Sequence, residues 1–157
     1  MKKALLLIVA SIYFLLQAQT VYAQIKTYQF EQIDSLQKIE KRNILIFIHT
    51  DWCKYCKMMQ NTTFKNDHII KMLNEKYYFI TLNAEEKRTI FFNNHTFSYK
   101  PTGTNTGSNE LTVQLGTIEN KLSFPTLCIL NANNEIIFQY PQYITTTDLK
   151  TILTRLN

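Results

Sequence analysis

The fold of this chain can be inferred from one stretch, Ile44-Leu-Ile-Phe-Ile-His-Thr-Asp-Trp-Cys-Lys-Tyr-Cys-Lys57. Its first half, 44–50, is mainly apolar and predicts a strand of a parallel sheet that is buried on both faces. Cys53 and Cys56 follow at once, and the residues after them are typical of a helix. Residues three apart lie on the same face of a helix, so these two thiols can close a small ring. A strand, a cysteine pair and a helix in this order predict a redox-active pair.

The first thiol of the pair sits where the predicted helix, 52–59, begins. Unpaired N–H groups and the helix dipole favour a thiolate at Cys53, whereas Cys56 lies one turn inside and is shielded. We expect reversible exchange, in which Cys53 attacks a substrate disulfide and Cys56 resolves the mixed disulfide.

Two other interpretations of the cysteine pair are an inert structural disulfide and half of a metal site. Zinc requires four ligands, and the sequence has no second C-x-x-C or C-x-x-H pair. It also lacks the C-x-x-C-H pattern of haem attachment. We therefore expect neither a metal nor a cofactor.

The first 23 residues have the pattern of a secretory signal peptide. Met1-Lys-Lys3 is a basic start, 4–16 is almost wholly apolar, and Val21-Tyr-Ala23 has small residues where a signal peptidase recognises them. A membrane anchor is the alternative, but a spanning helix needs about 20 apolar residues. We expect cleavage of residues 1–23, which leaves 24–157 as an exported domain, periplasmic or secreted.

Composition and charge fit one domain with a single core. The 17 Lys and Arg residues exceed the 12 Asp and Glu residues mildly and are scattered, which gives no footprint for nucleic acid. Export places cysteines where disulfides persist. The third cysteine, Cys128, lies inside an apolar stretch, and we expect it to be a buried, inert thiol in a monomeric protein.

Hydrophobic periodicity predicts a strand–helix–strand unit in the first half of the chain. A helix over 31–42 precedes the strand at 44–50, and the cysteine helix is followed by a second helical piece that Asn66-Asp67 caps. A strand over 77–82 completes the unit, with a right-handed crossover.

The segment 84–118 exceeds what this pattern requires. A β-hairpin is predicted over 89–99, because Asn93-Asn94 tolerates the positive φ of a tight turn. An open loop over 101–109 and a helix over 110–118 follow. The hairpin and loop are too short for a core of their own, so we expect an insertion rather than a second domain.

The last third of the chain predicts two strands and a helix. The strands are 127–130 and 136–140, and Thr145 or Thr146 caps the helix. The whole order predicts an α/β fold with a central mixed sheet flanked by helices.

Three segments resemble the thioredoxin superfamily: Asp51-Trp-Cys-Lys-Tyr-Cys-Lys57, Asn61-Thr-Thr-Phe64 and Ser123-Phe-Pro-Thr126. The first two are most similar to the C-terminal thioredoxin-like domain of the membrane electron carrier DsbD and its small secreted relatives. The resemblance covers about 30–157, with 84–118 unmatched. It implies a thioredoxin fold that carries a β-hairpin and loop insertion before a cis-proline.

The resemblance also assigns a substrate-binding surface. It implies that Pro125 is cis, faces the cysteine pair, and with its neighbours offers backbone groups to an extended substrate. The residues implied on this surface are Trp52, Phe124, Pro125 and Thr126. An ordinary proline at the start of a strand and a core tryptophan are the competing interpretations.

Two departures from the family pattern concern the thiols. Many thioredoxins carry a buried acid six residues before the first cysteine, and here that position is Phe47. Asp51, Glu85 or water then remains as the proton acceptor for the second cysteine. Lys54-Tyr55 stands where many relatives have a proline. Asp51 and Lys54 are candidates for tuning the thiols.

The sequence thus predicts an exported thiol–disulfide oxidoreductase, a reductase or isomerase that uses Cys53 and Cys56. Its expected partners are protein disulfide substrates and a thiol electron donor, for which a membrane protein is a candidate. The alternative is a non-catalytic thioredoxin-fold module that binds a protein partner or a thiophilic metal such as copper.

Overall fold

The computed structural model describes residues 24–156. The expected signal peptide, 1–23, lies outside the described residues. Within 24–156, no helix has the length and apolar character needed to cross a membrane.

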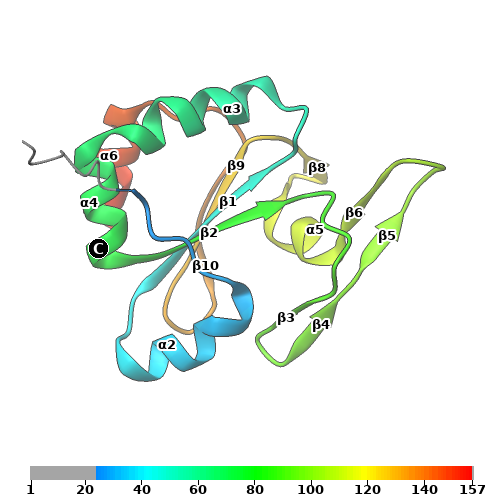
Figure 1. The fold of residues 1–157 in the computed structure, drawn as a ribbon, viewed down its shortest axis with the longest axis horizontal. Helices are drawn as coiled ribbons and strands as arrows, with labels where there is room; N and C mark the ends of the chain where they lie inside the picture. The colour runs from blue at the N-terminus through cyan, green and yellow to red at the C-terminus, as the bar shows by residue number, and fades with distance from the viewer. Residues whose placement is uncertain (1–23, 157) are drawn as a thin grey trace, which may run out of the picture.

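The centre of the fold is a mixed β-sheet (Figure 1). Its strands are β1 (Asn43–His49), β2 (Tyr77–Asn83), β9 (Thr126–Leu130) and β10 (Ile136–Tyr140), in the order β10-β9-β1-β2. β1 runs parallel to β2, and β9 is antiparallel to both β1 and β10. The predicted central mixed sheet is therefore confirmed.

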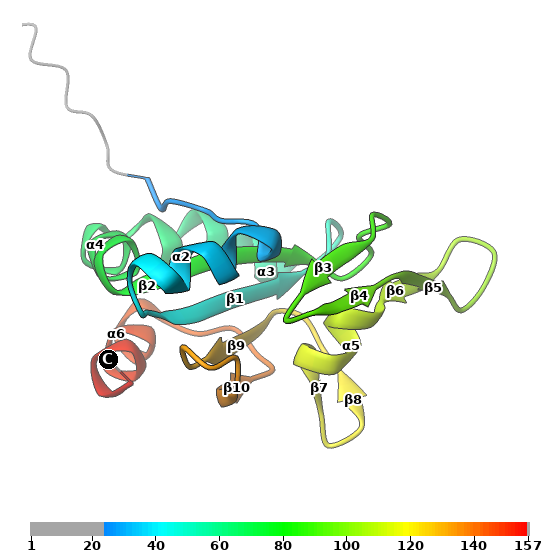
Figure 2. The ribbon, with the colours of Figure 1, turned by 90° about the horizontal axis from the view of Figure 1, so that it is seen from below.

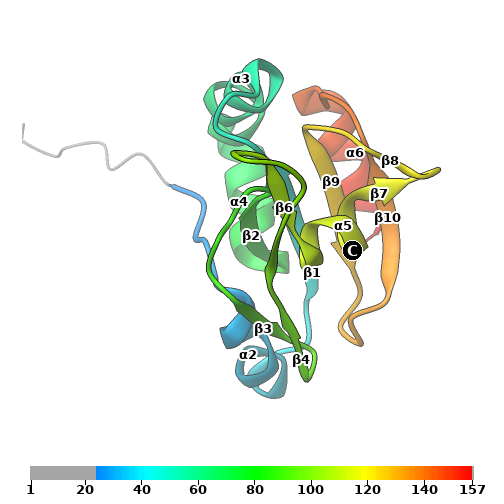
Figure 3. The ribbon, with the colours of Figure 1, turned by 90° about the vertical axis from the view of Figure 1, so that its right-hand side faces the viewer.

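Helices cover both faces of this sheet (Figures 1 and 3). On one face lie α3 (Lys54–Asn61), α4 (Asp67–Lys76) and α6 (Thr146–Arg155). On the other lie α2 (Ile33–Ile39) and α5 (Glu110–Gly116).

Strand β1 contributes side chains to the apolar clusters on both faces of the sheet, because successive side chains of a strand point to opposite faces. Ile44, Ile46 and Ile48 pack toward α2 and α5, whereas Leu45 and Phe47 pack toward α3, α4 and α6. All five are fully buried, as the apolar run predicts.

Side-chain caps fix where several helices begin. The Asn66 side chain accepts hydrogen bonds from the N–H groups of His68 and Ile69, and Thr145 accepts one from Asp148. Both caps were predicted. The helix predicted over 31–42 is instead a 3-10 turn, η1 (Phe30–Gln32), followed by the shorter α2. A second 3-10 turn, η2 (Thr63–Lys65), separates α3 from α4.

The predicted β-hairpin after β2 is confirmed. β3 (Ile90–Phe92) pairs with β4 (His95–Phe97), and the turn residues Asn93 and Asn94 have φ values of 52° and 61°.

The open loop predicted over 101–109 is wrong, because a second hairpin forms there. β5 (Tyr99–Pro101) pairs with β6 (Gly107–Asn109). The two strands approach each other closely at Gly107, where a Cβ atom would lie 2.5 Å from the Lys100 carbonyl oxygen. Only glycine fits this position, and no alternation of apolar residues signals the pairing. We call β3 to β6 the ribbon, and it projects from the body of the domain (Figure 2).

The helix predicted over 110–118 ends two residues early, at Gly116. The chain then forms a small hairpin from β7 (Thr117–Ile118) and β8 (Lys121–Leu122). The Glu119-Asn120 turn has positive φ at both residues, which lets two-residue strands reverse direction.

The root of the ribbon shares the core of the domain. Ile90 and Phe92 are buried, and the Phe92 ring meets Phe30 edge-on with centroids 5.1 Å apart. Leu111 and Leu115 of α5 belong to the same apolar cluster. The ribbon is thus anchored to the domain by ordinary core packing.

Candidate functional site

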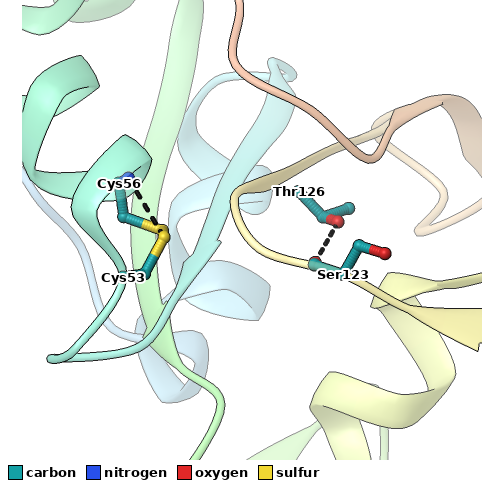
Figure 4. The surroundings of a disulfide bond; sticks show 4 residues. All are labelled: Cys53, Cys56, Ser123 and Thr126. Atoms are coloured by element: carbon teal, nitrogen blue, oxygen red, sulfur yellow. Dashed lines mark hydrogen bonds between the residues drawn. A yellow bond between two sulfur atoms is a disulfide. The ribbon is translucent and has the colours of Figure 1, made fainter.

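Cys53 and Cys56 form a disulfide at the end of β1 (Figure 4). Their Cα atoms are 5.3 Å apart. The helix predicted to begin at Trp52 begins at Lys54, because Cys53 is the extended N-cap residue. Its Sγ atom accepts a hydrogen bond of 3.1 Å from the Cys56 N–H.

This cap position favours negative charge on Cys53 once the disulfide is reduced. A helix N-terminus presents unpaired N–H groups, and the N–H of Cys56 already points at the sulfur. The first turn of α3 contains no acidic residue that would oppose the thiolate. Cys53 is 5% exposed and Cys56 is 1% exposed, so the structure shields Cys56 more completely.

Trp52 lies on the surface beside the disulfide. It is 65% exposed, so its interpretation as a core residue is wrong. Its indole N–H donates a hydrogen bond of 3.1 Å to the Glu85 carboxylate. The ring also meets Phe124 edge-on, with centroids 6.0 Å apart. Trp52 therefore links the start of α3 to the loop before β9.

The loop before β9 contains the expected cis peptide bond between Phe124 and Pro125. The Thr126 hydroxyl donates to the Ser123 carbonyl oxygen at 2.7 Å, which closes the loop. This loop lies opposite the disulfide (Figure 4). The Thr126 side chain is fully buried, so only its backbone can meet a ligand.

An open pocket of about 420 Å³ lies between α3 and this loop. The pocket is lined by Tyr55, Phe124, Pro125, Pro141, Gln142 and Tyr143. Tyr55 is 62% exposed at its rim. In the sequence, Tyr55 stands out only as a departure from the family pattern, although its place between the cysteines is a signal that assigns it to the site. The contribution of 141–143 carries no local sequence signal, because the fold alone brings that loop here.

An aromatic side chain stands where many thioredoxins carry a buried acid, and it packs among other rings. Phe47 is fully buried, meets Phe64 edge-on with centroids 4.9 Å apart, and stacks on His49 at 5.4 Å. Burial lowers the pKa of His49, and the nearby carboxylate of Asp51 partly offsets this effect. Asp51 and Lys54 are both exposed.

Cys128 lies on the opposite face of the sheet from the disulfide, where it belongs to the cluster packed against α2 and α5. It is a free thiol with no exposed surface, and burial raises its pKa to about 12. The prediction that this thiol is buried is confirmed, and its inertness stays a prediction.

Within residues 24–156, no group of three or more His, Cys, Asp or Glu side chains is arranged to hold a metal ion.

A comparison with protein families identifies the chain. The family model for the thioredoxin-like domain matches residues 29–157, so the chain belongs to this family. No curated protein matches the sequence significantly.

Solved structures with the same fold agree with this assignment. A DsbH oxidoreductase superposes with a TM-score of 0.60 at 14% identity, covering 89% of this chain and 90% of its own. A thioredoxin from Thermus thermophilus gives 0.60 at 14%, covering 85% and 87%. A thioredoxin-fold protein from Helicobacter pylori gives 0.57 at 15%, covering 87% and 76%. At these identities the likeness concerns the fold.

Proposed function

We propose that this protein is an exported thiol–disulfide oxidoreductase, which reduces or isomerises disulfides of other proteins through Cys53 and Cys56. The observation that carries the proposal is the position of Cys53 as the N-cap of α3, with its sulfur accepting the Cys56 N–H and bonded to the Cys56 sulfur. This arrangement activates one thiol and places the second within reach of it.

Both sulfur atoms of the pair take part in the reaction. The Cys53 thiolate attacks one sulfur of a substrate disulfide, which forms a mixed disulfide and releases the other substrate sulfur as a thiolate. Cys56 then loses its proton and attacks the Cys53 sulfur, which releases the second substrate thiolate. The substrate gains two electrons and two protons, and Cys53–Cys56 becomes the disulfide. An external thiol donor, for which a membrane protein is a candidate, restores the dithiol.

Phe47 affects the second step. With an aromatic ring in place of a buried carboxylate, the proton of Cys56 passes to water or to a surface carboxylate such as Asp51. We therefore expect resolution of the mixed disulfide to accelerate with rising pH, because the Cys56 thiolate is the attacking species. Lys54 and Asp51 act on the pair as solvent-exposed charges: the positive charge of Lys54 favours the Cys53 thiolate, and the negative charge of Asp51 disfavours it.

The substrate surface surrounds the disulfide. Trp52 and Tyr55 offer exposed aromatic faces, and the pocket between Tyr55 and Pro125 suits an apolar side chain of the substrate. The backbone of the loop before β9, from Phe124 to Thr126, offers hydrogen bonds to an extended peptide, as in strand addition.

Export rests on residues 1–23. The intact mass of the protein after secretion tests it, and we expect a mature chain that begins at Gln24. A secreted or membrane-bound form that retains Met1 would contradict cleavage.

A turnover assay with an insulin-type disulfide substrate and a thiol donor tests the activity. Wild-type protein should accelerate reduction, and Cys53→Ser should abolish the acceleration while the fold is retained. If the folded wild-type protein gives no acceleration over the donor alone, the catalytic proposal is overturned in favour of a binding module.

A further inference from the structure

We infer that Asn109, at the root of the ribbon, is a positioning residue for protein substrates, acting through Glu85 on Trp52. This inference rests on the proposed function, because it assigns Trp52 a role in substrate recognition. Asn109 would then connect the ribbon to the reactive pair through Glu85 and Trp52.

Asn109 is fully buried, and both polar atoms of its side chain have hydrogen-bond partners. Its backbone N–H donates to the Ala84 carbonyl at 2.8 Å, and its side-chain amide donates to the carbonyls of Glu86 and Arg88, each at 3.2 Å. Its side-chain oxygen accepts the N–H of Leu111 at 3.0 Å and caps α5. One side chain therefore fastens the loop after β2 to the junction of β6 and α5.

The fastened loop, 84–88, carries Glu85. The loop is also held at its start, where the Ala84 N–H donates to the His49 carbonyl at 2.7 Å and the Glu85 N–H donates to the Asn83 side chain at 3.0 Å. Held from both sides, the Glu85 carboxylate reaches back to the Trp52 indole N–H.

The Glu85 carboxylate, held in this way, fixes the Trp52 side chain. Trp52 is 65% exposed, and its side chain contacts Glu85 and the Phe124 ring. An exposed ring that is fixed before binding loses less side-chain entropy when a partner covers it. Since the ring directly precedes Cys53, its orientation affects how a protein surface approaches the sulfur, whereas a small disulfide needs no such surface.

Asn109→Ser separates the two roles of Asn109. Serine retains the cap of α5, because its hydroxyl accepts the same kind of hydrogen bond, but it lacks the amide that fastens the 84–88 loop. Glu85→Ala removes the contact with Trp52 directly. The matched control is Asn105→Ser, which makes the same exchange at the exposed tip of the ribbon.

The experiment measures kcat/KM with a protein disulfide and with a small disulfide, together with acrylamide quenching of Trp52, the only tryptophan of the chain. We expect Asn109→Ser and Glu85→Ala each to lower the ratio of kcat/KM for the protein disulfide to kcat/KM for the small disulfide by about threefold to tenfold. This change corresponds to the free energy of one net hydrogen bond. The change should fall mainly in KM, and quenching of Trp52 should increase. Asn105→Ser should behave as wild type.

The double variant distinguishes positioning from a general loss of structure. Residues that act through one path are not additive, so Asn109→Ser should have little further effect in the Glu85→Ala background. Full additivity, or an unchanged ratio and unchanged quenching in Glu85→Ala, would overturn the inference even if Asn109→Ser fails to fold. If wild-type protein turns over neither disulfide, the proposed function itself fails, and this outcome is distinct from an unchanged ratio.

Discussion

Selective alkylation of the three cysteines follows from their surroundings in numerical terms. The perturbation is mild reduction of the native protein, which opens Cys53–Cys56 and leaves three thiols. Burial raises the pKa of Cys128 to about 12, so about one molecule in 10⁴ carries a thiolate there at pH 8. An ordinary cysteine with a pKa of about 8.5 is about one-quarter ionised at that pH. Because the thiolate is the nucleophile, Cys128 should react about 10³-fold more slowly from ionisation alone.

The assay is a timed pulse of iodoacetamide at pH 8, followed by peptide mass spectrometry. Cys53 should be labelled first, because it caps α3 and is the more exposed of the pair. Cys56 should follow slowly, and Cys128 should remain unlabelled until denaturant is added. Cys128→Ala is the matched control, with native labelling unchanged and one label fewer after denaturation. Labelling of Cys128 at a rate comparable to Cys53 would refute its burial in β9.

Three further outcomes are expected. Tyr77→Phe should destabilise the protein by about 1 kcal/mol, measured by chemical denaturation, because the buried Tyr77 hydroxyl donates to the Leu153 carbonyl at 2.9 Å; an unchanged midpoint would contradict this. The Glu110 carboxylate accepts a hydrogen bond from the Ser98 N–H, which lowers the pKa of Glu110. This hydrogen bond therefore stabilises the folded protein above the unfolded pKa of about 4.3, and the stabilisation is lost as pH falls through the lower folded pKa. Thermal melts of Glu110→Gln should therefore lose less stability between pH 6 and pH 3 than wild type, and an equal loss would count against the interaction. Equilibration with glutathione should give a potential between about −270 mV and about −120 mV, the values of thioredoxin and DsbA, because the helix cap stabilises the Cys53 thiolate and so the reduced form; a potential at the DsbA value would favour an oxidase.

Features that depend on neighbours in the chain could be predicted from the sequence. The buried run of β1, the Asn66 cap and the Asn93-Asn94 turn each rest on a few adjacent residues with a strong local preference. The cysteine pair is predictable on the same basis, since its spacing puts one sulfur at the cap and the other in the first turn of α3.

Features that depend on long-range packing could not be predicted. The second hairpin of the ribbon has only three residues in each strand, and its close contact at Gly107 becomes visible only when both strands are in place. The roles of Tyr143 in the pocket and of Asn109 beneath the 84–88 loop depend on segments that the fold brings together. An asparagine before an apolar stretch indicates a helix cap, but nothing in the sequence indicates the two carbonyl groups that Asn109 also binds.

Capture of the mixed disulfide shows directly whether Cys53 attacks substrate disulfides. In Cys56→Ser, Cys53 remains able to attack a substrate disulfide, but the resolving thiol is absent. When this variant is incubated with a disulfide-bonded protein and quenched with acid, we predict a covalent complex that joins Cys53 to the substrate and dissolves on reduction. Cys53→Ser under the same conditions should trap little or none. A folded Cys56→Ser protein that forms no complex, or equal trapping by both variants, would contradict the assignment of Cys53 as the attacking thiol.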